Sequence, residues 1–445
     1  MISLENKKKV LNNKSLPCFA GTPFKKGRKN KKFIFTDIKK LNLKNQKTSD
    51  NKKKVLVWLS GWVDSAISAY LLKKQWYEVS AGFMINYIDK DNKNCQTKED
   101  IKMAKKVAKY LDIPFFTFNY VKEYKKSVFN YMYEWYKNWQ TPNPDIMCNS
   151  EIKFKIFLNE VIESWFDMIA TWHYARIERN HPLPNPPPKG EGIEHKEKNI
   201  IYVLKKWVDN TKDQSYFLSW LNQKQLSKIL FPLWDLKKSK VREIAENIWL
   251  PNAKRKDSQW ICFVWKVNIK TFLEKKITKK QWNIIDTKWN ILGKHNWFFY
   301  YTIGQRKWLD LWWQKEPIFV VKKDISKNEI IVWNKDDLGL YSDELFVKSF
   351  HFLWRKDFDF PLKAKAKIRY RQKDQSCVIY KLTASKKNNF SSKEVHNKGL
   401  QPLVHENNDD FYYKVKFKNK QRAIASWQTC AVYIKDELVM SGDIV

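Results

Sequence analysis

The sequence predicts an α/β protein that starts with a parallel sheet and ends in a C-terminal β-barrel. Between residues 53 and 264, short apolar segments rich in β-branched residues alternate with amphipathic segments, which is the pattern of βαβ units. After about residue 315, short alternating strands separated by regular turns are typical of a small barrel. We therefore divide the chain into a basic, poorly ordered extension (1–52), an α/β domain (53–264), a small central domain (265–338) and a barrel (339–445).

The first predicted strand, at 55–59, runs through a polar turn into a helix at 63–75. The turn carries Ser60, Gly61, Asp64 and Ser65. A strand, a tight turn and a helix N-terminus form a good anion site, because backbone N–H groups and the helix dipole point at the ligand. The stretch resembles the S-G-G-x-D-S loop of the PP-loop ATP pyrophosphatases, except that Trp62 stands where that family has glycine.

Tryptophan also stands in other turns where glycine is favoured, such as Trp139, Trp289 and Trp312-Trp313. The chain has 11 Gly and 22 Trp, whereas average usage of about 7% predicts about 31 Gly. An indole at Trp62 would fill the space that a phosphate needs, and tryptophan is poorly suited to a glycine-only backbone conformation. We hypothesise that the gene reads UGA as glycine and that the sequence was translated with UGA as tryptophan. The alternative is that the tryptophans are real, and mass spectrometry of the native protein at positions 58, 62 and 172 decides between them.

The chain is strongly basic and has few cysteines. It has 84 Lys and Arg against 47 Asp and Glu, a formal net charge of +37, which favours a nucleic-acid partner over a merely Lys-rich surface. Its six cysteines are scattered without a C-x-x-C pair, which excludes a disulfide scaffold and shows no metal-ligand spacing. No apolar run has the length of a membrane span and the N-terminus lacks a signal-peptide core, so we expect a cytoplasmic enzyme with no membrane partner.

Two further segments carry candidate chemistry. Met84 ends a predicted strand at 79–85, where it could stack on an adenine or simply belong to the core. The turn at 141–149 contains two prolines and presents Asn143, Asp145 and Cys148. Next to Lys153 and a helix N-terminus, Cys148 would have a lowered pKa and react as a thiolate, whereas the alternative is an inert buried cysteine.

A strand predicted at 167–170 ends in a turn that, with glycine at position 172, would present its backbone and His173 to a ligand. The Pro-rich segment at 180–198 is predicted to be a surface-loop insertion. Cys262 lies in a short apolar strand after a basic run.

Several of these stretches together resemble the MnmA-type tRNA 2-thiouridylases. The resemblance covers residues 53–445 and implies a parallel-sheet PP-loop ATP pyrophosphatase fold (adenine nucleotide alpha hydrolase-like) for the catalytic domain at 53–264. The departures are the Trp-for-Gly positions, the N-terminal extension and the Pro-rich insertion. The matching stretches follow the family's order: 60–65, 141–154, 170–174, 212–218, 257–263 and 302–307.

The resemblance implies that ATP, with Mg²⁺, adenylates O2 of the wobble uridine in tRNA. A sulfur-carrier protein or cysteine desulfurase would load Cys262 as a persulfide, and Cys148 would act as the nucleophile. Both cysteines should then face one cleft near the phosphate loop. The implied ATP contacts are Trp58, Leu59, Ser60, Gly61, Trp62, Val63, Asp64, Ser65, Met84 and Trp172. Asn143, Pro144 and Asp145 would meet the target base, and His173, Lys212, Asp213, Gln214, Arg369, Tyr370 and Gln428 would contact the tRNA.

Two other functions stay open at this point. The chain could be another PP-loop ligase, such as an argininosuccinate synthase or a lysidine synthetase, although the two cysteines argue against both. If the tryptophans are real, it could be a tRNA-binding protein without catalysis.

Overall fold

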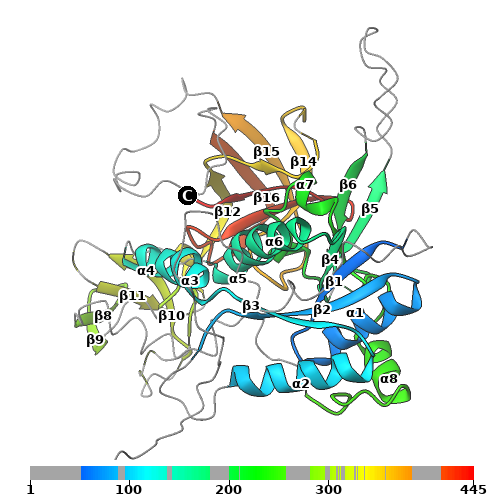
Figure 1. The fold of residues 1–445 in the computed structure, drawn as a ribbon. Coiled ribbons are helices and arrows are strands. Elements are labelled where there is room, and N and C mark those ends of the chain that lie inside the picture. The colour runs from blue at the N-terminus through cyan, green and yellow to red at the C-terminus, as the bar shows by residue number, and fades with distance from the viewer. Residues whose placement is uncertain are drawn as a thin grey trace, which may run out of the picture.

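The computed structural model describes residues 52–88, 96–137, 143–180, 200–209, 211–256, 281–295 and, with short gaps, 301–382 and 412–445. Figure 1 shows the α/β domain at the bottom, the barrel above it and a small four-stranded sheet to one side. Among the described residues, no helix is long and apolar enough to cross a membrane.

The α/β domain is built on a five-stranded parallel sheet, as the sequence predicted. The strand order is β3-β2-β1-β4-β7, and every neighbouring pair is parallel. All five strands therefore end at the same edge, where ligands bind in open α/β sheets. The strands are β1 (Lys54–Trp58), β2 (Glu78–Ile85), β3 (Phe115–Asn119), β4 (Met168–Ala170) and β7 (Ile229–Leu230).

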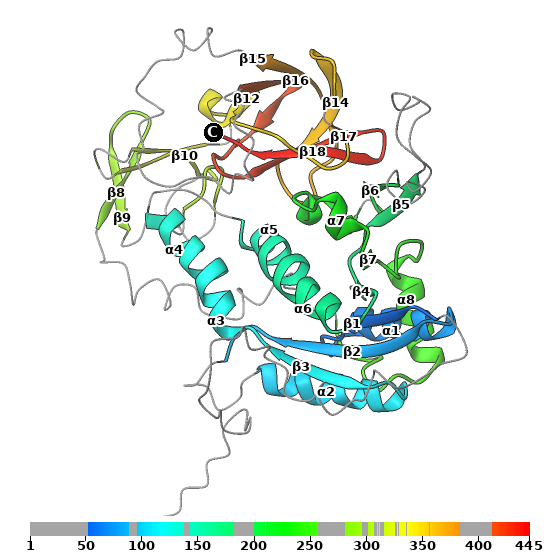
Figure 2. The ribbon, with the colours of Figure 1, turned by 45° about the horizontal axis from the view of Figure 1, so that its top comes forward.

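Alternate residues of β1 face opposite layers of helices, as the period of a strand requires. Val55 and Val57 pack in a core with α1 (Val63–Lys74), α2 (Gln96–Tyr110) and α8 (Lys238–Asn247). Leu56 and Trp58 pack in a second core with the helices that lie between the sheet and the barrel (Figure 2). Those helices are α3 (Val121–Tyr124), η2 (Lys125–Phe129), α4 (Asn130–Lys137), α5 (Pro144–Met147), η3 (Cys148–Phe157) and α6 (Leu158–Glu163).

The C-terminal strands curl into a barrel. They follow the order β12-β16-β15-β14-β17-β18 with antiparallel neighbours. A bridge between Val347 and Ile444 joins the last strand back to the first and closes the barrel. The strands are β12 (Tyr341–Val347), β14 (Leu362–Lys367), β15 (Gln375–Leu382), β16 (Tyr412–Arg422), β17 (Thr429–Ile434) and β18 (Glu437–Asp443); β13 (His351–Phe352) pairs with β18.

A hairpin of the α/β domain extends this barrel sheet. It consists of β5 (Arg176–Asn180) and β6 (Ile201–Lys205), and β6 pairs with β18. Lys205 lies within 3.4 Å of Glu437 and Arg176 pairs with Asp436, so the two domains share both a sheet and a row of ion pairs. The sequence predicted no strands beside the Pro-rich segment, because β5 and β6 lack a clear apolar alternation.

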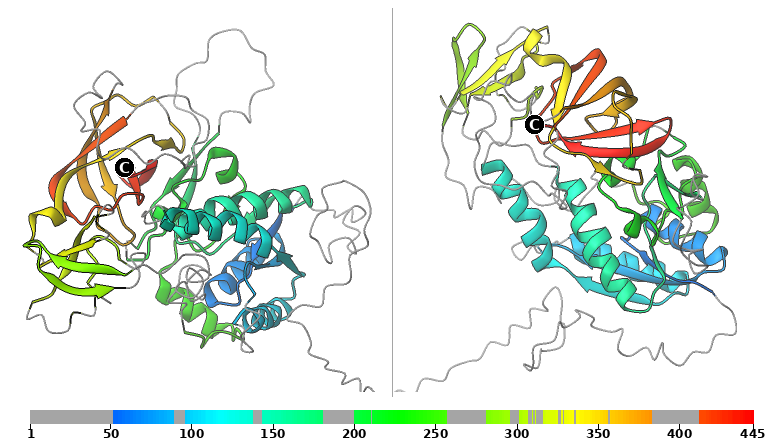
Figure 3. Two further views of the ribbon diagram at one scale, coloured as in Figure 1. Left: turned by 90° about the vertical axis from the view of Figure 1, so that its left-hand side faces the viewer. Right: turned by 90° about the horizontal axis from the view of Figure 1, so that it is seen from above.

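The central domain is a four-stranded sheet of order β10-β11-β8-β9 that lies beside the barrel (Figure 3). Its buried core contains Trp282, Ile284, Val320 and Val332. The strands are β8 (Trp282–Asp286), β9 (Ile291–His295), β10 (Phe319–Asp324) and β11 (Glu329–Trp333).

Tryptophan occupies backbone conformations that favour glycine. Of the nine described non-glycine residues with positive φ, five are tryptophans: Trp76, Trp165, Trp249, Trp289 and Trp427. The N–H of Phe166 donates to Val161 O and that of Leu250 to Ala245 O, which is the Schellman pattern with Trp165 and Trp249 at its glycine position. Both indoles are more than two-thirds exposed, so packing does not explain them. This backbone pattern supports glycine as the native residue at these sites.

Trp165→Gly and Trp249→Gly should each raise the free energy of unfolding by about 0.5–1 kcal/mol. A left-handed conformation costs a residue with a Cβ about 1–2 kcal/mol, and the extra freedom of glycine in the unfolded chain offsets part of that gain. Urea unfolding of the single variants measures the difference. Trp234→Gly is the control, because Trp234 is also exposed, at 48%, but lies outside the positive-φ set. An equal gain from Trp234→Gly would contradict this reading.

Candidate active site

The loop between β1 and α1 has the backbone of a phosphate-binding turn. Gly61 has a φ of +83°, and a Cβ there would lie 2.6 Å from the carbonyl oxygen of Asp100. The hydroxyls of Ser60 and Ser65 lie 3.1 Å apart, and the N–H of Ser60 donates to Ser65 Oγ. No side chain caps the start of α1 within the described region, so the N–H groups of its first turn point toward the loop. The loop and the first turn of α1 therefore fit the phosphates of a nucleotide.

The expectation that Trp62 is forced into a glycine-only conformation is wrong. Its φ is −99° and its ψ is 161°, an extended backbone open to any residue. Its indole centroid lies 3.7 Å from the guanidinium carbon of Arg255. Arg255 donates to Gly61 O at 3.0 Å and pairs with Asp100 at 2.6 Å. Trp62 therefore packs against the arginine that holds the loop in place.

Asp64 of the loop is held by two residues from outside it. The hydroxyl of Tyr174 donates to Asp64 Oδ1 at 2.9 Å, and Lys238 of α8 forms an ion pair with the same oxygen. The side chains of Leu59 and Val63 are buried in the core beside α1, so these two residues can offer a nucleotide only their backbone atoms.

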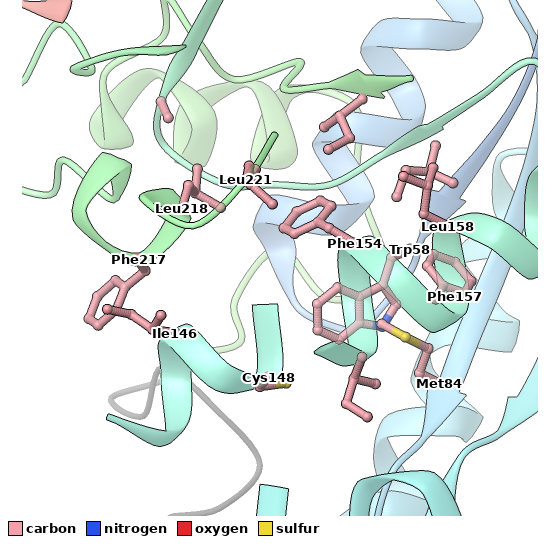
Figure 4. Close-up of a cluster of buried hydrophobic side chains, with 14 of the residues drawn as sticks. Trp58, Met84, Ile146, Cys148, Phe154, Phe157, Leu158, Phe217, Leu218 and Leu221 are labelled. Carbon is pink, nitrogen blue, oxygen red and sulfur yellow. The ribbon is translucent and has the colours of Figure 1, made fainter. Parts of the chain in front are cut away.

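Two indoles fill the region that the sequence predicts for an adenosine. The ring centroids of Trp58 and Trp172 are 4.1 Å apart, and Lys153 Nζ lies 4.6 Å from the Trp58 centroid. Met84 is 1% exposed and lies beside Trp58 in the same buried cluster (Figure 4). An adenine stacked on Met84 would need the space of these indoles. The residues as written thus fit the phosphates but not the adenosine, whereas glycine at 58 and 172 would open the site.

Cys148 belongs to this same cluster. Its side chain is 1% exposed and belongs to the same buried cluster as Trp58, Met84 and Phe154 (Figure 4). The structure therefore brings the predicted nucleophile to the predicted nucleotide site, from a helix more than 80 residues away from the loop in sequence.

The helix that carries Cys148 starts earlier than the sequence suggested. Asn143 caps α5, because its Oδ1 accepts from Ile146 N at 3.3 Å, and Pro144 occupies the first turn. Asp145 is 8% exposed on this turn. Cys148 then lies one turn inside a continuous helix, at the point where α5 becomes the π-helical η3. π-helical turns are frequent at functional sites because they shift side chains out of the regular register.

The other cysteines in the described part of the chain are buried in the barrel. Burial raises the pKa of Cys377 to about 12 and raises the pKa of Cys430 further, so neither thiol ionises near neutral pH. Cys262 and residues 257–263 lie outside the described residues. The shared cleft for Cys148 and Cys262 therefore stays a prediction.

His173 is buried instead of facing solvent. Its Nδ1 lies 2.8 Å from Thr171 Oγ1, and its ring packs against Phe154 and Phe231. Burial, and to a smaller extent the charge of Lys153, hold the pKa of His173 well below its usual range. The imidazole is thus neutral and packs inside the protein just after β4. Its buried position does not support the predicted direct contact with tRNA.

The pKa of His173 predicts a loss of stability in mild acid. The unfolded chain binds a proton at this histidine below about pH 6.5, whereas the folded chain does not. The stabilisation is therefore present above that pH and is lost as the pH falls toward the folded-state pKa. His173→Gln should flatten the fall in free energy of unfolding between pH 7.5 and 5.5, measured by urea unfolding. An unchanged pH dependence would show that the buried imidazole is not the cause.

The remaining predicted tRNA residues gather at one end of the barrel. Lys367 pairs with Ala431 across β14 and β17, so Arg369 and Tyr370 after β14 lie near Gln428 before β17. The segment 212–214 lies below this end, and Gln214 Oε1 accepts from Tyr174 N at 2.9 Å. Asp213 is an exception, because its carboxylate is buried and bonded within the protein. The predicted contact of Asp213 with tRNA therefore finds no support in the position of its side chain.

Sequence reasoning missed the residues that support the loop from a distance. Asn252 donates to Gly61 O at 3.1 Å, as Arg255 does, and Lys238 pairs with Asp64. The only sequence feature that marked any of these residues was the basic run that begins at Lys254, and it did not indicate that Arg255 would contact the phosphate loop. Within the described residues, no group of His, Cys, Asp or Glu could hold a metal ion.

Comparison with known proteins identifies the family. Residues 53–266 match the family model described as tRNA methyl transferase HUP domain, and residues 270–334 match tRNA methyl transferase PRC-barrel domain. The tRNA-specific 2-thiouridylase MnmA of Streptococcus uberis is 41% identical over 343 residues, which cover 75% of this chain and 86% of that protein. The chain belongs to the MnmA family of tRNA-specific 2-thiouridylases. Its fold class and its phosphate loop agree with that membership.

Other MnmA proteins match to the same degree. The one from Streptococcus thermophilus is 40% identical over 75% of this chain and 86% of its own length, and that from Staphylococcus aureus strain JH9 is 41% identical over 74% and 86%. Among solved structures, the U34-tRNA thiolase NcsA from Methanococcus maripaludis aligns with a TM-score of 0.30 at 20% identity, over 51% of this chain and 67% of that one. This structural similarity is too low to carry an argument.

Proposed function

We propose that the chain is a tRNA-uridine 2-sulfurtransferase that converts the wobble uridine 34 of tRNA to 2-thiouridine with ATP. Membership of the MnmA family supports the reaction class. The observation that carries the proposal for this chain is the position of Cys148, which shares a buried cluster with Met84 and with residue 58, the residue that ends β1 and leads into the phosphate loop. A nucleotide-activated base and a sulfur nucleophile would meet at this cluster.

The proposed chemistry replaces an oxygen by sulfur in two stages. ATP, as a substrate with its Mg²⁺, transfers its adenylyl group to O2 of the uridine and releases pyrophosphate. A persulfide on Cys262, loaded by a sulfur-carrier protein or a cysteine desulfurase, supplies the sulfur. If Cys148 attacks the inner sulfur of the Cys262 persulfide, a disulfide forms between the two cysteines and the outer sulfur leaves as hydrosulfide, which attacks the activated C2 and expels AMP with the original O2. If Cys148 attacks the activated C2 first, it expels AMP, and hydrosulfide freed from the persulfide by an external thiol then displaces Cys148 from C2. In both routes an external thiol reduces the disulfide that is left. In each case the attacking cysteine must be a thiolate.

The residues divide into three proposed groups. Ser60, Gly61, Asp64 and Ser65 with the backbone of α1 would hold the phosphates. The adenosine would lie on Met84 in the space that opens with glycine at 58 and 172. Asn143, Pro144 and Asp145 would meet the target base, and a wobble base reaches such a site at low cost because anticodon-loop bases unstack readily. The proposed tRNA contacts are Lys212, Gln214, Arg369, Tyr370 and Gln428.

AMP formation separates this function from the other PP-loop reactions. Protein with glycine at 58, 62 and 172 is incubated with ATP, Mg²⁺, tRNA and a persulfide donor, and AMP and 2-thiouridine are measured together. We expect AMP to form only with tRNA present. AMP formation that requires citrulline and aspartate, or free lysine, in place of the persulfide donor would favour an argininosuccinate synthase or a lysidine synthetase. tRNA binding without AMP would favour an RNA-binding protein without catalysis.

The net charge of +37 predicts that tRNA binding weakens steeply with salt. Each neutralised phosphate contributes about −0.7 to −0.9 to the slope of log affinity against log salt concentration. Titration of tRNA at 50–200 mM salt measures this slope, and we expect a value that corresponds to several phosphates. A slope near zero would show that the basic charge is a general surface property.

A further inference from the structure

Four charged side chains form a row between the catalytic domain and the barrel, and all but Asp374, which is 26% exposed, are buried. Asp213 and Lys206 come from the catalytic domain, and Lys367 and Asp374 come from the barrel. Lys367 Nζ lies 3.0 Å from Asp213 Oδ2 and 3.7 Å from Asp374 Oδ1, and Lys206 pairs with the other oxygen of Asp374. The side chain of Asp213 is 1% exposed and that of Lys367 is 7% exposed. The charges alternate along the row, so each is next to its opposite.

The carboxylate of Asp213 has its partners inside the protein. Its Oδ1 accepts from the backbone N–H groups of Trp207 and Ser215, at 3.1 and 3.2 Å. Its Oδ2 accepts from Ser215 Oγ at 2.9 Å and from Lys367 at 3.0 Å. The ring of Tyr433 lies under Lys367, with 5.3 Å between Nζ and the ring centroid. An RNA phosphate or base has no access to this carboxylate.

A buried ion pair is weak evidence for stability, because desolvation of the two charges offsets most of their attraction. Such a pair is better explained by the geometry that it specifies. Lys367 ends β14, two residues before Arg369 and three before Tyr370. Asp213 comes just before η4 (Ser215–Leu218). The pair therefore joins the turn after β14, which carries the proposed tRNA contacts Arg369 and Tyr370, to this short helix.

The short helix in turn contacts the helix of Cys148. The rings of Phe217 and Tyr370 have centroids 4.4 Å apart. The carbonyl oxygen of Phe217 accepts from Asn149 Nδ2 at 2.9 Å, and Asn149 is the residue after Cys148. If the barrel turn moved relative to η4, the turn would therefore also move relative to Cys148.

We propose that Asp213 and Lys367 are positioning residues that set the barrel's tRNA-binding turn over the Cys148 helix. The pair increases tRNA affinity by holding Arg369 and Tyr370 in place, and neither charge touches the RNA. This inference rests on the proposed function for the identity of its ligand, and its test uses tRNA binding instead of thiolation.

The salt dependence of tRNA binding separates positioning from direct contact. Lys367→Met and Asp213→Asn should each weaken tRNA binding about tenfold at fixed salt, with an unchanged slope of log affinity against log salt concentration. Lys212→Met is the matched comparison, because it removes a proposed phosphate contact beside Asp213 and should reduce the slope by about 0.7–0.9. Lys367→Arg should keep most of the affinity. A slope reduced by Lys367→Met, or unchanged affinity in that variant, would overturn the proposal.

The double variant Asp213→Asn/Lys367→Met controls for stability. Each single variant leaves a buried charge without its main partner, whereas the double variant removes both charges, and the amide oxygen of the introduced asparagine can still accept from the backbone. We expect the unfolding temperature of the double variant to be close to that of the unchanged protein, while its affinity for tRNA stays low. Recovery of tRNA binding together with stability would show a merely structural pair. A protein that binds tRNA as expected here but forms no 2-thiouridine would refute the proposed function and leave this inference intact.

Discussion

Replacing Trp58 and Trp172 by glycine is expected to give the chain a measurable affinity for ATP. The ring centroids of the two indoles lie 4.1 Å apart in the region proposed for the adenosine, while Gly61 of the phosphate loop already has a positive φ. A ligand at 100 times its Kd raises the free energy of unfolding by about 2.7 kcal/mol. Thermal unfolding with and without Mg-ATP should therefore show a clear upward shift for the double variant and none for the unchanged chain.

Two controls make this result specific. Trp62→Gly alone should leave ATP binding as it was, because Trp62 has an extended backbone and packs on Arg255. Trp282→Gly removes a fully buried indole from the central domain and should lower stability by about 3–5 kcal/mol without any response to ATP. ATP stabilisation of the unchanged chain equal to that of the double variant would show that the indoles do not block the site.

Cys148→Ser and Cys262→Ser should each lower 2-thiouridine formation by at least about 10³-fold while adenylation of the tRNA, measured as pyrophosphate release, persists. A serine hydroxyl at Cys148 cannot act as a thiolate nucleophile or resolve a persulfide, and the loss of a nucleophile typically costs this much or more. The phosphate loop is untouched in both variants, so adenylation of the tRNA should continue. The assay uses protein with glycine at 58, 62 and 172, and follows pyrophosphate and 2-thiouridine in the same reaction.

The barrel cysteines are the matched controls. Cys377→Ser and Cys430→Ser should retain thiolation, because burial raises the pKa of both thiols far above neutrality and keeps them from reacting. Cys430→Ser should still lower the unfolding temperature, since Cys430 is fully buried. Full thiolation by the Cys262→Ser protein would remove the persulfide role from that residue.

The α/β fold could be predicted because local pattern and tertiary contacts agree there. The apolar run at 55–59 is buried on both faces of the sheet, and the turn at Gly61 has the positive φ that its glycine suggested. The hairpin β5–β6 could not be predicted, because its strands are stabilised by the edge of β18, which lies more than 230 residues further along the chain. The helix at Cys148 was placed too late, since Asn143 and Pro144 begin it within a segment that reads as a turn.

The motifs of the site could be predicted from the sequence, but the buried residues that hold them in place could not. The phosphate loop, Met84 and Cys148 each carry a local signal, and the structure places Met84 and Cys148 in one buried cluster with Trp58, which leads into the loop. Asp213 and His173 are buried by residues distant in sequence, such as Lys367 and Phe231. The local sequence does not indicate that these two side chains are buried. The Trp-for-Gly positions were recognised as a group from composition, but only the backbone distinguishes Trp165, with positive φ, from Trp62, which is extended.

Nucleoside mass spectrometry of tRNA treated with the chain tests the central claim most directly. Unmodified tRNA is incubated with ATP, Mg²⁺ and a persulfide donor, once with the chain as written and once with glycine at 58, 62 and 172. We expect 2-thiouridine at the wobble position only from the glycine form. The absence of 2-thiouridine from the glycine form, although it binds both ATP and tRNA, would contradict the account.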